Sequence, residues 1–86
     1  MEVEYKKKAQ DDRAYWKEKG DLKVQKRISD LIKDICKHPF TGIGKPEPLK
    51  YELSGLWSRR ITRGHRMIYE VTTIGISIIS MKGHYQ

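Results

Sequence analysis

Three strand patterns follow one another so closely in the C-terminal half of the chain that they restrict the fold more than any other feature. Apolar and β-branched residues recur at strand spacing over residues 57–62, 66–72 and 75–82. The links at residues 63–65 and 73–74 are long enough only for hairpins. The three segments are therefore predicted to form an antiparallel meander.

Two helices and a short strand are predicted before the meander. Val3 and Tyr5 alternate with glutamates, which is typical of a strand, and residues 7–19 are rich in helix formers up to Gly20. Residues 22–37 place apolar side chains on one helical face, at the positions Val24, Ile28, Leu31, Ile32 and Ile35. The order strand, helix, helix, strand, strand, strand predicts one α+β domain over residues 1–86, with both helices on one face of an antiparallel sheet.

Strand parity predicts which side chains face the helices. In the middle strand of the meander, Met67, Tyr69 and Val71 share the apolar face, so Arg66 is expected on the open face. In the last strand, apolar residues fall on both parities. Either a β-bulge near residues 78–79 or burial of both faces would explain this pattern.

Composition favours a soluble protein that binds a polyanion. The 86 residues carry a net charge of +7, and no apolar run approaches the roughly 18 residues of a membrane span. No signal peptide is visible, and the single cysteine, Cys36, indicates a reducing cytoplasm. Four of the six cations in residues 46–86 are arginines, which suit bidentate phosphate contacts and favour nucleic acid as the partner. No ligand spacing for a metal is present, and no cofactor is predicted.

The chemistry of RNA cleavage directs attention to three side chains. Attack by a 2′-hydroxyl needs a base, an acid for the leaving 5′-oxygen and a cation on the phosphorane oxygens. Glu47, between Pro46 and Pro48 in a stiff loop, could be the base, with Arg66 as the cation and His84 as the acid. Each also has an ordinary reading, as a turn residue, a surface cation and a tail residue. The residues alone therefore support a basic α+β domain that binds nucleic acid.

The order of several motifs resembles a known family. The chain reads PF-x-G-x-GKPEPLK over residues 39–50, LSG-x-WSRRIT over 53–62, HR-x-x-Y over 65–69 and HY near its end. DD-x-x-x-W at residues 11–16 and LIKDI in the second helix extend the match over nearly the whole chain. This series resembles the YoeB toxins of the RelE-like superfamily of bacterial toxin–antitoxin systems.

The resemblance implies a microbial RNase-like fold and a ribosome-dependent mRNA endoribonuclease that acts in the ribosomal A site, against 16S rRNA. By position in the motifs, it implies a general base at Glu47, a phosphate-stabilising arginine at Arg66, a general acid at His84 and an adjacent aromatic at Tyr85. It further implies RNA contacts from a set of basic residues: Lys50, Arg59 and Arg60. The expected partners are a YefM-like antitoxin and a second copy of the chain.

Two other functions remain open at this point. A non-catalytic RNA or ribosome binder would need the basic residues but neither Glu47 nor His84. A topoisomerase inhibitor like the ParE branch of the superfamily would need no nuclease site, and the joint presence of Glu47, Arg66 and His84 argues against it.

Overall fold

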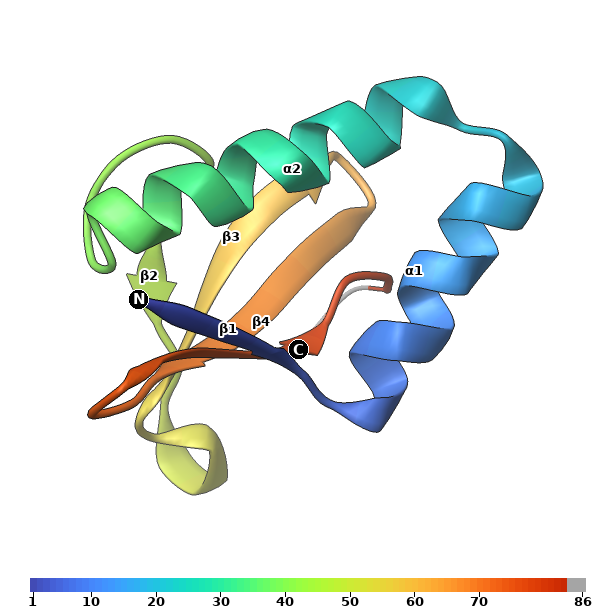
Figure 1. Cartoon of the computed structure of the whole chain (residues 1–86). Coiled ribbons are helices and arrows are strands. Elements are labelled where there is room, and N and C mark those ends of the chain that lie inside the picture. Colours follow the sequence, from blue (N-terminus) through green and yellow to red (C-terminus); the bar gives the residue numbers. More distant parts are fainter. Residues whose placement is uncertain (84–86) are drawn as a thin grey trace.

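The computed structural model describes residues 1–83 and folds them into a five-stranded mixed sheet with two helices (Figure 1). The helices are α1 (Lys7–Lys19) and α2 (Leu22–Lys37), and a short 3₁₀ helix, η1 (Tyr51–Leu53), follows the second strand. In sheet order the strands are β1 (Glu2–Tyr5), β5 (Gly75–Ser80), β4 (His65–Val71), β3 (Leu56–Thr62) and β2 (Glu47–Pro48). The predicted α+β class, the two helices and the antiparallel β3–β4–β5 meander are confirmed.

The sheet differs from the prediction at both edges. β1 pairs with β5 in parallel, so the sheet is mixed instead of wholly antiparallel. A parallel pair is possible because both helices and the other strands lie between these two segments, which gives the long connection that parallel strands need. At the other edge, the loop around Glu47 adds the short strand β2, and Pro48 suits an edge because it has no N–H to donate.

The helix ends follow from their local sequence. Gly20 takes a left-handed backbone conformation (φ 70°) after α1, where other residues would be strained. The carboxylate of Asp21 then accepts a hydrogen bond from the Val24 N–H at 3.0 Å and caps the N-terminus of α2. The helix face predicted from spacing is buried, because Val24, Ile28, Leu31 and Ile35 all belong to the core.

A bulge in β5 explains its apolar residues of both parities. Ile68 of β4 pairs with Ser80 and Tyr69 pairs with Ile78, so Ile79 has no partner in the ladder. The extra residue reverses the side-chain alternation. As a result Ile78 and Met81, an odd number of positions apart, both lie in the core.

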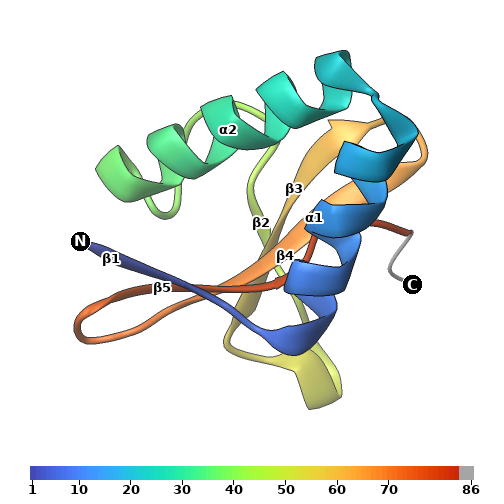
Figure 2. The same cartoon turned by 45° about the vertical axis from the view of Figure 1, so that its right-hand side comes forward.

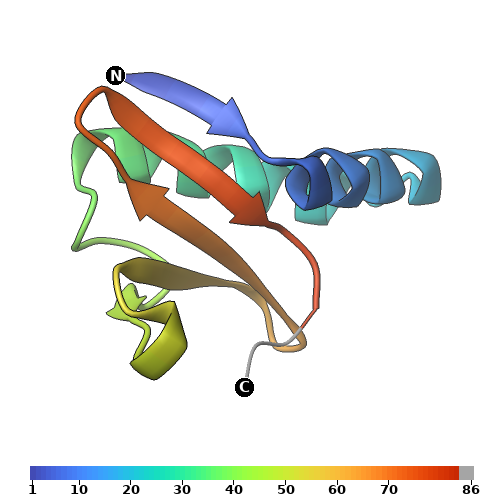
Figure 3. The same cartoon turned by 90° about the horizontal axis from the view of Figure 1, so that it is seen from below.

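The helices leave one face of the sheet uncovered. Met67 and Tyr69 pack in the core with α1 and α2, whereas the alternate residues of β4 face the other way. Figure 3 shows the strands in front of α2, with α1 beside the sheet after the end of β1. Within residues 1–83, neither helix is long and apolar enough to cross a membrane.

Candidate active site on the open face of the sheet

Three strands bring Glu47, Ser58 and Arg66 together on the open face. Glu47 of β2 lies directly opposite Ser58 of β3, which itself pairs with Ile68 of β4. Arg66 lies two residues from Ile68 on the same strand and is therefore the diagonal neighbour of Ser58, within reach of a long side chain. The parity prediction for Arg66 is confirmed.

The guanidinium of Arg66 is held between a hydroxyl and a carboxylate. Its Nη2 donates to Glu47 Oε1 at 2.9 Å and to Ser58 Oγ at 2.9 Å, and its Nε donates to the same Ser58 Oγ at 3.2 Å. Ser58 is fully buried, and the Arg66 side chain is only 15% exposed, whereas the Glu47 side chain is 60% exposed. A fixed cation thus lies beside an accessible carboxylate, which is the pairing that phosphoryl chemistry needs for a base and for a charge on the phosphorane.

Two of the predicted RNA contacts lie where a polyanion could reach them. Arg60 is exposed and lies directly across from Arg66 in the β3–β4 ladder, so both arginines are on the open face. Lys50 is exposed at the start of η1, just after β2. Both exposed cations therefore follow Glu47 in the chain, Lys50 directly after β2 and Arg60 on β3.

Arg59 does not lie at this surface, and its predicted contact with RNA is wrong. Its side chain is fully buried on the helical face, where it points toward the C-terminal end of α2. Its Nη1 donates to Asp34 Oδ2 at 2.6 Å, and its Nε donates to the Tyr69 hydroxyl at 3.1 Å. The remaining N–H groups donate to backbone carbonyls of the connector after α2, at His38, Thr41 and Ile43. A guanidinium with so many internal partners ties that connector to the sheet.

The Arg59 network also perturbs two acids. The hydrogen bond from Arg59 lowers the pKa of the Asp34 carboxyl, although partial burial opposes this. Burial raises the pKa of the Tyr69 phenol, whose O–H donates to the Pro39 carbonyl at 2.7 Å. Near neutral pH, Asp34 is therefore ionised and Tyr69 is neutral, and these are the forms that accept hydrogen bonds from Arg59 here. The connector that they hold leads directly into the strand that carries Glu47.

The remaining predicted site residues, His84 and Tyr85, lie outside the described part of the chain. The last described residue, Gly83, is next to the site, because its carbonyl accepts the Arg66 N–H at 3.0 Å. Its own N–H donates to His65 Nδ1 at 2.9 Å. Gly83 has a positive φ of 95°, so the turn that was expected before His84 uses a conformation suited to glycine.

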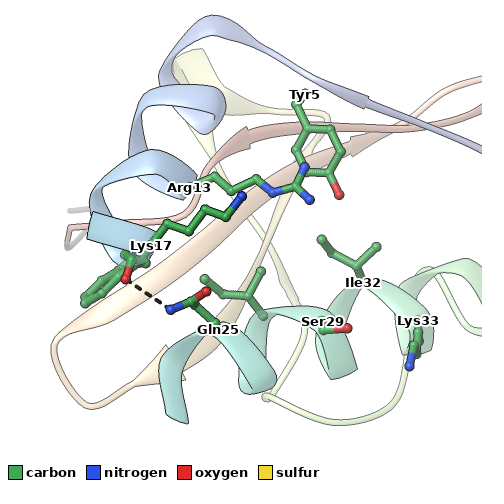
Figure 4. A pocket seen from close by; sticks show the side chains of 9 residues that line it. Tyr5, Arg13, Lys17, Gln25, Ser29, Ile32 and Lys33 are labelled. Carbon is green, nitrogen blue, oxygen red and sulfur yellow. Dashed lines mark hydrogen bonds between the residues drawn. The ribbon is translucent and has the colours of Figure 1, made fainter. Parts of the chain in front are cut away.

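A hollow elsewhere in the molecule does not contain these groups. It has a volume of about 330 Å³ and lies between α1 and α2, lined in part by Tyr5, Arg13, Lys17, Ile32 and Lys33 (Figure 4). The Arg13 guanidinium stacks over the Tyr5 ring, 4.9 Å from its centroid. Among residues 1–83, no carboxylate or imidazole lines this hollow, so the described residues do not provide there the Glu and His pair expected from the sequence.

Sequence reasoning missed Ser58, Asp34 and the tail contact of His65. Ser58 shares its parity with Arg60, so its open-face orientation could have been found from the sequence. Its contact with Glu47 and Arg66 could not, because this depends on the register of strands that are distant in the chain. In residues 1–83, no three His, Cys, Asp or Glu side chains gather as a metal site would require.

Comparison with known proteins shows the family to which this chain is similar. The model of the YoeB-like toxin of bacterial type II toxin–antitoxin systems matches residues 5–85. Toxin YoeB of Escherichia coli K12 is 47% identical over 85 residues, which cover 99% of this chain and 100% of that protein.

Solved structures agree with this assignment. The YoeB/ParE toxin from Agrobacterium tumefaciens is 39% identical with a TM-score of 0.93, over 99% of this chain and 100% of that one. The Staphylococcus aureus YoeB dimer is 40% identical with a TM-score of 0.90, and YoeB of that organism is also known in a heterotetrameric complex with YefM (40%, TM-score 0.88). Each of these matches covers 99% of this chain and 98% of the other. A more distant RelBE2 toxin–antitoxin complex from Mycobacterium tuberculosis (18% identity, TM-score 0.69, over 95% of each chain) shows the RelE-like fold alone. This chain belongs to the YoeB-like toxins of bacterial type II toxin–antitoxin systems.

Proposed function

We propose that this toxin is a ribosome-dependent mRNA endoribonuclease that cuts the codon in the ribosomal A site. The observation that supports it best is the contact of Glu47 with Arg66 at 2.9 Å on an uncovered sheet face. Membership of the YoeB-like toxins supports a nuclease of this kind. The proposed site of action is the cytoplasm, on ribosomes, where the basic residues Lys50 and Arg60 contact mRNA or 16S rRNA.

In the proposed reaction the 2′-hydroxyl of the mRNA attacks the adjacent phosphate. Glu47 accepts the 2′-hydroxyl proton, and Arg66 stabilises the charge that develops on the phosphorane oxygens. His84 gives a proton to the departing 5′-oxygen, beside Tyr85, so that a 2′,3′-cyclic phosphate and a 5′-hydroxyl result. The substrate phosphate competes with Glu47 for Arg66, which frees the carboxylate to take the proton.

Two protein partners are part of the proposal. An antitoxin of the YefM kind binds and inhibits this toxin, as expected from the YoeB–YefM complexes of Staphylococcus aureus. A second copy of the chain forms a homodimer, as expected from the YoeB dimer of that organism. Light scattering of the toxin alone and with the co-expressed antitoxin measures both assemblies.

The test is cleavage of mRNA in a translating extract by wild type, Glu47→Ala, Arg66→Ala and His84→Ala. We expect Arg66→Ala and His84→Ala to lower the cleavage rate by about 10²-fold or more each, because each acts in the transition state. Glu52→Ala is a matched control, since it removes an exposed carboxylate of the following 3₁₀ helix.

Undiminished cleavage by all three site variants would exclude the assignment. Binding to ribosomes without cleavage by the wild type would favour a non-catalytic binder, which depends on Lys50 and Arg60. A gyrase supercoiling assay tests the third function. If the wild type and Glu47→Ala inhibit gyrase equally, a ParE-like activity would be favoured.

A further inference from the structure

The segment after β5 leaves the sheet and runs between α1 and the β3–β4 hairpin (Figures 1 and 2). It comprises residues 81–83 and ends the described part of the chain. Its backbone groups are bound mainly by side chains of other elements instead of by a neighbouring strand. The DD-x-x-x-W motif of α1 supplies two of these side chains, Asp12 and Trp16.

Helix α1 binds both backbone polar groups of Met81. The Met81 N–H donates to Asp12 Oδ2 at 2.9 Å, and its carbonyl accepts the Trp16 Nε1–H at 2.9 Å. Asp12 is 4% exposed and Trp16 is 5% exposed, so both contacts are shielded from water. Lys8 Nζ adds a bridge, because it donates to Asp12 Oδ2 at 2.8 Å and to the Lys82 carbonyl at 3.3 Å.

Strand β4 binds the segment two residues later. Gly83 donates to His65 Nδ1 and accepts from the Arg66 N–H, so its backbone is fixed at both polar groups. The His65 ring packs edge-on against Trp16, with centroids 4.9 Å apart and an interplanar angle of 88°. The helix contact and the strand contact are therefore joined through two aromatic rings.

We propose that Asp12, Trp16 and His65 are positioning residues that fix residues 81–83 next to Arg66, and that the rate of the reaction depends on this placement. This rests on the proposed nuclease function and on His84 as its acid. The reaction requires such positioning contacts, because an acid must lie within about 2.6–3.2 Å of the oxygen that it protonates. Misplacement by about 1 Å can lower a rate by about 10²-fold.

Substitution of His65 allows an effect on the position of residues 81–83 to be distinguished from an effect on the stability of the fold. The hydrogen bond to Gly83 is exposed, so water can replace it and the fold loses little when it is removed. His65→Phe keeps an aromatic ring against Trp16 but removes the acceptor. His65→Asn keeps an acceptor near the place of Nδ1. A purely structural role would make His65→Phe the milder of the two substitutions, whereas a positioning role makes it the more harmful.

The first experiment measures kcat and KM for ribosome-dependent mRNA cleavage together with the thermal midpoint. We expect His65→Phe to lower kcat about 3- to 10-fold, the range that corresponds to loss of one hydrogen bond. KM and the thermal midpoint should stay near those of the wild type, and His65→Asn should recover most of kcat. Equal kcat for wild type and His65→Phe would overturn the positioning role.

The second experiment compares the two adjacent carboxylates of α1. Asp11 is exposed and pairs only with Lys7, at 2.9 Å, so Asp11→Ala is the matched control for Asp12→Ala. We expect Asp12→Ala to lower kcat about 10-fold and to accelerate hydrogen exchange at the Met81 amide, at a temperature where the variant is folded by circular dichroism. Asp11→Ala should change neither quantity.

The exchange measurement distinguishes failure of this inference from failure of the proposed function. If the wild type does not cut mRNA, the proposed function falls, and with it the catalytic part of this inference. The amide exchange then tests the tail contacts alone. If the wild type cuts mRNA and the Met81 amide exchanges equally fast in wild type and Asp12→Ala, the contact with α1 does not hold the tail and the inference is wrong.

Discussion

The buried guanidinium of Arg59 allows a sharp test, because stability and RNA contact predict opposite results there. Arg59→Met keeps most of the apolar volume and removes the charge and all donors. Removal of one partner of a buried ion pair costs about 3–5 kcal/mol. The Asp34 side chain is 22% exposed and can be partly hydrated, so we expect the lower end, about 3 kcal/mol.

This loss is large for a domain of 86 residues, whose total free energy of unfolding is expected at about 4–13 kcal/mol. At about 4–8 °C for each kcal/mol, the thermal midpoint should fall by roughly 12 °C or more. Urea unfolding followed by tryptophan fluorescence measures the free energy, and calorimetry measures the midpoint. Arg60→Met is the matched control, since Arg60 is exposed and its replacement should change stability by no more than about 0.5 kcal/mol.

The two variants should also differ in function. We expect Arg60→Met to weaken ribosome binding and to reduce its salt dependence by about one counterion. Arg59→Met should bind normally once the unfolded fraction is taken into account. If Arg59→Met retains its unfolding free energy within about 1 kcal/mol and loses ribosome binding, the structural role derived for Arg59 is refuted.

Three further results are expected. The hydrogen bond from Arg59 lowers the pKa of Asp34, so the stability that this carboxylate contributes is present above about pH 4 and is lost as pH falls through the folded pKa. The difference in unfolding free energy between wild type and Asp34→Asn should therefore shrink between about pH 7 and about pH 3 in urea titrations. Gly75→Ala should destabilise the fold by about 1–3 kcal/mol, because an added Cβ would lie 1.9 Å from the Glu2 carbonyl oxygen, and equal midpoints in urea would contradict this. Ser58→Ala should lower the kcat of mRNA cleavage about 10-fold with little change in KM, since Ser58 orients the Arg66 guanidinium, and an unchanged kcat would remove that role.

The periodicity of apolar residues predicted the helices and strands well, because it depends on interactions between residues that are close in the chain. The helix over residues 22–37 has the bounds that were predicted, since its apolar spacing, Asp21 cap and following Pro39 all act locally. Parity likewise predicted that Arg66 faces away from the helices. The same parity places Arg59 with Trp57 on the helical face, so its burial could have been predicted if a paired internal arginine had been considered.

Other features depend on contacts that sequence patterns do not contain. The partner of Arg59 is Asp34, 25 positions earlier, and nothing in the spacing of either residue indicates the other. The parallel pairing of β1 with β5 and the pairing of Glu47 with Ser58 similarly join distant segments. These contacts are decided by how the layers pack, which becomes known only once the whole fold is built.

The candidate site lies on the open face of the sheet, but the segments that carry it are held by contacts on the helical face. Arg59 fixes the connector that leads to the carboxylate of Glu47, and it does so from the side of α2. Trp16 of α1 fixes the segment that ends beside Arg66. The two strands between them carry Ser58 and Arg66 and are rigid through their ladder. If the proposed nuclease function holds, substitutions in the helices should therefore lower the cleavage rate through the placement of Glu47 and of residues 81–83, even where every surface charge is kept.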